Sequence, residues 1–270
     1  MCKVLGVPRS TFYKSKNHTP SKREVENEKL LNEIQTLHAE SEQRYGAPKI
    51  HKQLLKTQIN VSLKRVQRLM KQHSLRSIIV KKFRPHATKK TVTQKPNLIN
   101  DLVINNRNQV WVGDITYIHT KQHGWCYLAS VMDVYTKKII GWCFSKRMTT
   151  DCVVQALNNA IGRQGVSEGL IFHSDMGSQY TSQEFEQLLQ SNEIKHSFSK
   201  KGYPYDNAAM ESFHATLKKE EVYVKNYDTY EEARLALFKY IESWYNRKRI
   251  HGSINDMTPE EFDLLLQSAS

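Results

Sequence analysis

Three consecutive β-rich segments constrain the fold of this chain more than any other feature of its sequence. Residues 110–118, 125–134 and 139–144 are rich in β-branched and aromatic residues, and short connections containing Gly or Lys join them. Such closely spaced segments favour an antiparallel meander, because antiparallel strands can be joined by tight turns. The middle of the chain is therefore predicted to form a β-sheet.

Helical and extended segments alternate after these strands. The pattern predicts helices over 151–161 and 182–191, short strands over 170–172 and 194–198, and then a strongly helical stretch. The order βββαβαβα gives a mixed sheet flanked by helices. We therefore predict an α/β fold with a mixed five-stranded sheet, the layout of a ribonuclease-H-like core.

The first hundred residues carry all of the excess positive charge. They hold 22 Lys and Arg against 6 Asp and Glu, residues 101–270 hold 18 against 21, and the net charge of the chain is +13. A basic half joined to a near-neutral half is typical of a chain that binds a polyanion through its basic half. A basic surface that serves only solubility would carry the same charge, so charge alone leaves both interpretations open.

The sequence predicts four successive parts. Residues 1–20 resemble the end of a helix-turn-helix, with Gly6 at the turn, and the first helix of that motif would have to precede the chain. Residues 21–80 are predicted to form an all-α DNA-binding domain of helix-turn-helix type. Residues 81–100 form a basic linker without apolar periodicity, and residues 101–267 form the α/β core with its C-terminal helices.

One predicted helix in the basic half combines an N-cap with a basic surface. Ser62 is placed to cap it, and the apolar residues that follow fall on one helical face. Lys64, Arg65 and Arg68 fall mostly on other faces. We therefore predict that these three side chains contact DNA phosphates.

The cysteines and the hydropathy exclude several classes of protein. Cys2, Cys126, Cys143 and Cys152 form no CxxC pair and no regular spacing, so neither a zinc ribbon nor a disulfide framework is predicted. No apolar run reaches the roughly 18 residues of a membrane span, and the N-terminus is too polar for a secretory signal. We expect a cytoplasmic protein without a membrane partner.

Two aspartates stand where an ionised side chain needs a partner. Asp114 lies inside an apolar strand, where a buried carboxylate is costly unless a cation such as a metal ion neutralises it. Asp175 follows the strand over 170–172, at the edge of the sheet where sites in open α/β folds collect. Both are therefore candidate metal ligands.

Glu211 lies in the strongly helical stretch that follows. This helix has an apolar stripe formed by Met210, Phe213 and Leu217. Its polar face carries Asn207, Glu211, His214 and Lys218. A metal-binding Glu211 with Lys218 farther along the same face suits phosphate chemistry, because the lysine can hold the nucleic-acid strand.

Each carboxylate also has a structural interpretation. Asp114 would then be a structural residue of its strand, Asp175 a turn former and Glu211 half of a surface ion pair. Asp133 has an environment similar to that of Asp114, but a structural role is favoured for it. His173 is interpreted as a core histidine with satisfied hydrogen bonds.

Taken together, these acidic segments resemble a known family. The segments 111–117, 173–180 and 207–213 resemble the three acidic motifs of DDE transposases and retroviral integrases. Thirty-five residues lie between Asp175 and Glu211, the separation that marks the integrase-like branch. The resemblance implies that Asp114, Asp175 and Glu211 are the catalytic and metal-binding residues.

The end of the chain narrows the resemblance. Residues 245–251 and 258–262 are similar to the tail of the bacterial insertion-sequence members, in particular the second-frame transposases of elements whose two overlapping frames are joined by frameshifting. The likeness thus spans nearly the whole chain. A partial helix-turn-helix over 1–20 is what the junction between two frames would leave.

The resemblance implies a reaction and a set of partners. It implies two Mg²⁺ or Mn²⁺ ions, with Asp114 bridging them, Asp175 completing the shell of one and Glu211 that of the other. Lys218, Lys200 and Lys201 are the candidate DNA contacts near the site, with a solvated loop as the alternative for Lys200 and Lys201. The implied partners are double-stranded DNA, both transposon ends and target, a second copy of the chain, and an upstream-frame DNA-binding product, in the bacterial cytoplasm at the nucleoid.

Zinc is not expected. The zinc domain of retroviral integrases uses two histidines and two cysteines, whereas the histidines in the N-terminal part of this chain have only Cys2 beside them.

The apolar residues Leu235, Phe238 and Ile241 recur at helical spacing and favour a buried face, with an oligomer interface as the alternative.

The predicted function is metal-dependent DNA cleavage and strand transfer by the transposase of an insertion sequence. Two other functions would keep the same fold. A catalytically silent, transposase-derived DNA-binding regulator has no need of the intact carboxylates. A ribonuclease-H-type nuclease acting on hybrids has no need of the basic helical half.

Overall fold

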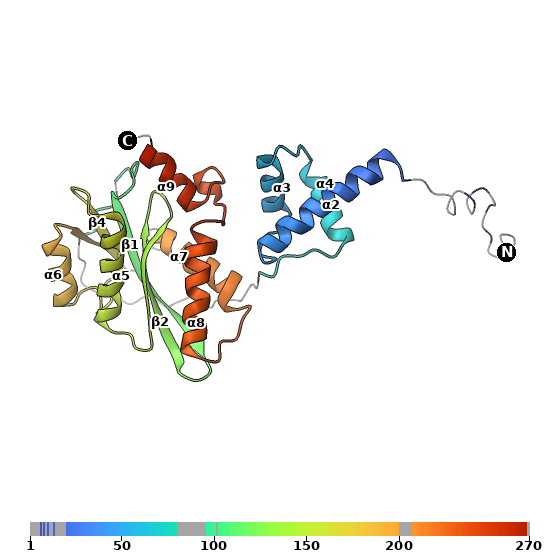
Figure 1. Cartoon of the computed structure of the whole chain (residues 1–270). Coiled ribbons are helices and arrows are strands. Elements are labelled where there is room, and N and C mark those ends of the chain that lie inside the picture. Colours follow the sequence, from blue (N-terminus) through green and yellow to red (C-terminus); the bar gives the residue numbers. More distant parts are fainter. Residues whose placement is uncertain are drawn as a thin grey trace. The chain divides into compact units, whose positions relative to one another are not determined.

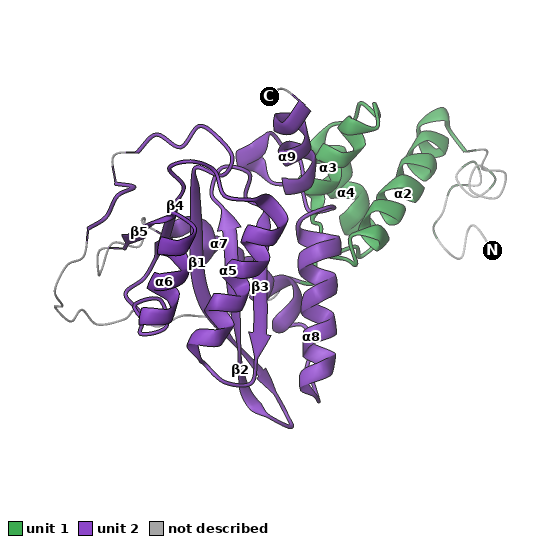
Figure 2. Ribbon diagram, turned by 60° about the vertical axis from the view of Figure 1, so that its left-hand side comes forward, with its two compact units in different colours: residues 1–78 green, residues 79–270 purple. Residues whose placement is uncertain are grey.

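In the computed structural model the chain divides into two compact units, residues 1–78 and residues 79–270 (Figure 2). The structure describes residues 20–79, 96–100, 102–199 and 207–268, with four single positions closer to the N-terminus. The partial helix-turn-helix predicted over 1–20 and most of the linker predicted over 81–100 lie outside the described residues.

The first unit is a small cluster of helices (Figure 1). It contains α2 (Lys22–Glu40), α3 (Ala47–Lys56) and α4 (Leu63–Gln72). Ser21 begins α2 with a capping box. Ser62 caps α4 by accepting a hydrogen bond from the backbone N–H of Arg65, and this cap was predicted from the sequence. The core consists of apolar side chains from all three helices, among them Ile34, Ile50, Leu54 and Val66.

The second unit is built on a mixed sheet of five strands (Figure 1). The strands are β1 (Val110–Thr120), β2 (Gly124–Asp133), β3 (Ile139–Ser145), β4 (Ile171–Ser174) and β5 (Lys195–Phe198), in the order β3-β2-β1-β4-β5. The first three pair antiparallel, whereas β1, β4 and β5 pair parallel. The predicted meander and the ribonuclease-H-like layout are confirmed.

Helices cover both faces of the sheet. The helices of this unit are α5 (Thr150–Gln164), α6 (Gln183–Ser191), α7 (Ala208–Leu217), α8 (Tyr230–Phe238) and α9 (Pro259–Ser268). α5 and α6 pack on the face that carries Trp111 and Phe172, both fully buried. α7 and α8 pack on the other face, where Tyr230 stacks on Phe144 with ring centroids 4.9 Å apart. No helix in the described part of the chain is long and apolar enough to span a bilayer.

The C-terminal helices contain two π-helical segments. η1 (Lys218–Val222) continues α7, η2 (Lys239–Tyr245) continues α8, and the short 3₁₀ helix η3 (Gly252–Ile254) follows. A π-helical segment has more residues per turn than an α-helix, so it displaces the buried face of the residues that follow.

The face that α8 buries corrects one prediction, because Ala233 and Leu237, four residues apart, form its buried stripe. Leu235 and Phe238 are 54% and 48% exposed, so the predicted buried face of Leu235, Phe238 and Ile241 is wrong for its first two members. The residues that α8 and η2 bury instead are Ala233, Leu237, Tyr240, Ile241, Trp244 and Tyr245.

Gly141 brings β3 and α5 into close contact and gives a test of this packing. A Cβ at Gly141 would lie 2.1 Å from the carbonyl oxygen of Ala156 and 2.7 Å from the nitrogen of Ala160. Gly141→Ala is therefore expected to lower the free energy of unfolding by about 1–3 kcal/mol, because the backbone of α5 must move away. Urea denaturation measures the change.

Gly162→Ala in α5 is the matched control. A Cβ at Gly162 would meet nothing within 4 Å, and Ala is the better helix former by about 0.5–1 kcal/mol. The free energy of unfolding of the Gly162→Ala control should therefore be unchanged or higher. An equal loss of stability in both variants would contradict the close packing at Gly141.

Candidate active site

Asp114 and Asp175 lie on neighbouring parallel strands. The pairing of β1 with β4 places Val112 opposite His173. Asp114 is two residues beyond Val112, and Asp175 is two residues beyond His173. The parallel register therefore brings both carboxylates to the same level, just past the C-terminal end of β4.

The environment of Asp114 is partly buried and polar. Its side chain is 27% exposed, and Oδ2 lies 3.3 Å from Nδ1 of His214 on α7. Oδ1 accepts a hydrogen bond of 2.8 Å from the backbone N–H of Ile115. The carboxylate is thus held at the sheet surface with its position fixed from two sides.

Asp175 is placed by a tight turn. Its Oδ1 accepts a hydrogen bond of 2.9 Å from the backbone N–H of Gly177. A Cβ at Gly177 would lie 2.9 Å from that same oxygen, so glycine suits the position. Burial raises the pKa of Asp175, and the negative charge of Asp114 raises it further against the opposing effect of the Gly177 hydrogen bond.

Glu211 lies in the first turn of α7, where its side chain is exposed. The apolar stripe predicted for this helix is confirmed, since Met210, Phe213 and Leu217 are buried. Among the described residues, no three His, Cys, Asp or Glu side chains come close enough together to hold a metal ion. The structure therefore brings Asp114 and Asp175 together but does not add Glu211 to a common cluster.

His214 is a site residue that the sequence analysis missed. It is 6% exposed, and its Nδ1 faces Asp114 while its buried Nε2 has no hydrogen-bond partner in the described part of the chain. The sequence placed His214 on the polar face of its helix with Glu211, and that spacing was the available signal. The helix pattern contains no information on which strand this face contacts.

Asp133 and His173 have the structural roles that were favoured for them. Asp133 accepts hydrogen bonds from the backbone N–H groups of Asn108 and Thr136, at 2.6 and 2.7 Å, and from the Thr136 hydroxyl at 2.9 Å. Each ring nitrogen of the buried His173 lies 2.9 Å from a serine hydroxyl. Neither side chain faces the candidate site with an unsatisfied group.

The three basic residues predicted on α4 differ in their surroundings. Lys64 and Arg68 are exposed. Arg65 instead turns toward α2, where its Nε donates a hydrogen bond of 2.8 Å to Asn27 and its terminal nitrogen lies 3.3 Å from a carboxylate oxygen of Glu26. Arg65 therefore joins two helices of the first unit.

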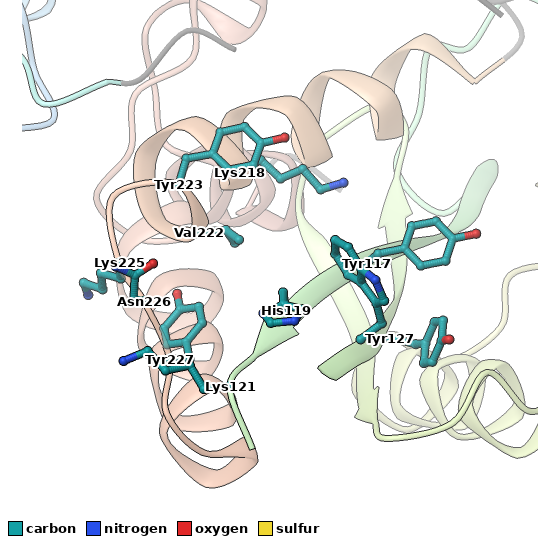
Figure 3. Close-up of a pocket in the computed structure, with 11 residues that line it drawn as sticks. Tyr117, His119, Lys121, Tyr127, Lys218, Val222, Tyr223, Lys225, Asn226 and Tyr227 are labelled. Atoms are coloured by element: carbon teal, nitrogen blue, oxygen red, sulfur yellow. The ribbon is translucent and has the colours of Figure 1, made fainter. Parts of the chain in front are cut away.

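Lys218 lines a pocket in the second unit (Figure 3). The pocket has a volume of about 540 Å³ and lies between the β1–β2 hairpin and the segment from Lys218 to Tyr227. Lys200 and Lys201, the other two predicted contacts, lie outside the described residues.

Comparisons with known proteins agree with this architecture. Two models described as "Integrase core domain" match residues 105–204 and 192–259, and one described as "HTH-like domain" matches residues 25–83. The transposase of insertion sequence element IS904 from Lactococcus lactis is 41% identical over 249 residues, which cover 90% of this chain and 97% of that protein. This chain belongs to the transposases of insertion sequences.

Further relatives of this transposase extend over the same length. The transposase InsF of insertion sequence IS3A from Escherichia coli is 34% identical over 267 residues, covering 97% of this chain and 92% of that protein. Among solved structures, the catalytic core domain of HTLV-2 integrase in complex with magnesium is 21% identical, with a TM-score of 0.44, over 57% of this chain and 95% of that one. The two integrase-core models and the two insertion-sequence transposases confirm the predicted membership in the DDE transposases.

The raised pKa of Asp175 yields a stability test of the carboxylate pair. A carboxylate with a raised pKa in the folded state costs stability while it is ionised, and that cost disappears as the pH falls through the folded-state pKa. In metal-free protein, Asp175→Asn should therefore raise Tm at pH 7, and the gain should shrink toward pH 4. Calorimetry at both pH values measures it.

Asp133→Asn is the matched control for that measurement. The pKa of Asp133 is also raised by burial, but both of its carboxylate oxygens accept hydrogen bonds. An amide would turn its NH₂ group toward a donor, so this variant should lose about 1–3 kcal/mol. A lower Tm for Asp175→Asn at pH 7 would contradict the cost that burial, together with the charge of Asp114, places on the ionised Asp175.

Proposed function

We propose that this transposase cleaves DNA at the ends of its insertion sequence and joins the ends to target DNA in a metal-dependent reaction. The observation that carries the proposal is the placement of Asp114 and Asp175 at one level on adjacent parallel strands. The matches to the integrase core domain and to insertion-sequence transposases also support the proposal.

The chemistry of the two carboxylates fits a divalent cation. Burial and the charge of Asp114 together raise the pKa of Asp175, so a cation between them would offset both the desolvation and the repulsion. Carboxylate oxygens are hard ligands and favour Mg²⁺ or Mn²⁺ over metals that prefer thiolates. Bound divalent ions activate an attacking oxygen and stabilise the leaving oxygen in phosphoryl transfer.

Glu211 is proposed as the third ligand. α7 packs against β1, and Glu211 lies in its first turn, one turn before the histidine that faces Asp114. In this proposal Asp114 would hold both ions, with Asp175 as a further ligand of one and Glu211 of the other. His214 fixes the orientation of Asp114, so it is a positioning residue and does not touch the substrate.

The basic residues supply the proposed contacts with double-stranded DNA. Lys64 and Arg68 are exposed on α4 of the helical domain, proposed to comprise residues 21–80, and would bind phosphates. Lys218 with Lys200 and Lys201 would hold the strand beside the carboxylates. Arg65 is proposed to act through the stability of that domain, because its guanidinium is bound to α2.

The assembly follows from the substrate. An insertion sequence has two ends that must be brought together, so we propose a homo-oligomer as the working form, acting on the bacterial nucleoid. We further propose that an upstream-frame DNA-binding product works with the chain or is fused to it. Residues 81–100 would then be the tether to a catalytic core over 101–267.

Substitution of the carboxylates tests the reaction. Cleavage and strand transfer are measured with Mg²⁺ and with Mn²⁺ on DNA that carries the ends of the element, alone and with the upstream-frame product fused. Asp114→Asn and Glu211→Gln should each lower the rate more than about 100-fold, because loss of even an outer-shell partner costs about 10–100-fold. Both variants should still bind the DNA ends. The control is Glu168→Gln, at an exposed site in the α5–β4 connection, which should leave the rate unchanged.

Two results would replace the proposal with another function. Wild-type protein that binds the ends but cuts nothing with either metal would be a DNA-binding regulator. Wild-type protein that hydrolyses RNA–DNA hybrids and leaves the ends intact would be a ribonuclease-H-type nuclease.

A further inference from the structure

The pocket that Lys218 lines supplies none of the proposed metal ligands (Figure 3). Tyr117, on its strand side, comes three residues after Asp114 on β1, which is ~10 Å along a strand, and its side chain points to the opposite face of the sheet. Lys218, on its helical side, comes seven residues after Glu211, which is ~10 Å along a helix. The pocket therefore lies within a few nucleotides of the site where the DNA strand would be cut.

Aromatic side chains form the strand side of this pocket. Tyr117 is paired with Tyr127 and His119 with Trp125 across the β1–β2 hairpin. The ring centroids of these pairs lie 5.6 Å and 5.2 Å apart. Trp125 is 59% exposed and Tyr117 is 49% exposed. A cluster of exposed rings beside a pocket marks a site for a ligand with a flat apolar face.

Lysines surround the same pocket. Lys121, Lys218 and Lys225 line it. Lys121 lies 2.7 Å from Asp228, which raises the pKa of its ammonium, and Lys225 lies 2.7 Å from Glu221. An ammonium group has three N–H donors, so a lysine with one ion pair still has donors for a second anion. The pocket thus combines aromatic faces with cations.

This combination identifies the class of ligand. A nucleotide presents a flat base that stacks on aromatic rings and a phosphate that lysines bind. A phosphate backbone in a duplex would use the lysines but not the rings, because both faces of each paired base are covered by its neighbours in the stack. The volume of about 540 Å³ lies in the range of small-ligand pockets.

We propose that this pocket binds one unpaired nucleotide of the DNA end, with its base stacked against Trp125 and Tyr117 and its phosphate on Lys218. The proposal rests on the proposed function, because it takes the DNA end as the substrate. Unpairing a base costs stacking and pairing energy, and stacking on the protein offsets that cost. Holding one nucleotide in the pocket would set which phosphate reaches Asp114.

Fluorescence of a labelled DNA end tests the proposal. The full chain is mixed with two duplexes that carry 2-aminopurine near the end, one with a three-nucleotide single-stranded overhang and one fully paired. Wild-type protein should quench the overhang probe by stacking. Trp125→Ala should remove this quenching and bind the overhang about tenfold more weakly, from a stacking contribution of about 1–3 kcal/mol per base.

Two further variants make the result specific. Trp125→Phe keeps an aromatic ring and should retain most of the quenching. Phe238→Ala removes an aromatic side chain that is 48% exposed outside this pocket, and it should bind both duplexes as the wild type does. The proposal is overturned if the Trp125→Ala protein quenches the overhang probe as the wild type does. It is also overturned if this variant binds both duplexes more weakly by the same factor.

The same samples separate this proposal from the proposed function. Wild-type protein that cleaves DNA without quenching the overhang probe overturns the nucleotide pocket and leaves the catalytic proposal standing. Wild-type protein that quenches the probe, but cleaves nothing with Mg²⁺ or Mn²⁺, supports the pocket and overturns the catalytic proposal. If the pocket binds a protein partner instead, every variant should show the same probe quenching and the same duplex binding as the wild type. That result also overturns the nucleotide proposal.

Discussion

The parallel pairing of β1 with β4 is the interaction on which the rest of this structure depends. It joins the N-terminal meander to the α/β part of the sheet, and its register, Val112 opposite His173, sets Asp114 beside Asp175. A shift of one residue would turn the side chain of one aspartate to the opposite face of the sheet. The buried packing of β3 on α5 and of α6 beneath Phe172 holds that register, so the geometry of the site is a consequence of the core.

A second constraint holds the lysine side of the nucleotide pocket. Glu220 in η1 is 3% exposed, and it accepts hydrogen bonds from the hydroxyl of Tyr240 and the indole of Trp244 and forms an ion pair with Arg249. A buried carboxylate needs such partners, because an unpaired charge in the interior is costly. These contacts fix the π-helical turn that begins with Lys218, and they give the tail segment over 245–251 a structural role within the catalytic unit.

The sequence predicted what depends on local periodicity. The five strands, the buried stripe of α7 and the cap at Ser62 follow from residue spacing and side-chain chemistry, and the structure confirms them. It did not predict that His214 faces Asp114, that Arg65 binds α2, or that Leu235 is exposed on α8. Those features depend on which elements meet in space, and helix periodicity alone does not encode the partner of each face. Glu211 remains a prediction that rests on its motif and on its position in α7.

The most direct test of the central claim is the location of bound Mn²⁺ by anomalous scattering from crystals of the transposase with DNA ends. The account predicts a peak in contact with oxygens of both Asp114 and Asp175, at about 2.0–2.2 Å as for hard cations of this size, and a second peak that adds Glu211. Peaks that avoid Asp114 and Asp175 at saturating Mn²⁺, or a single ion held elsewhere in the chain, would contradict the claim that this strand pair is the catalytic centre.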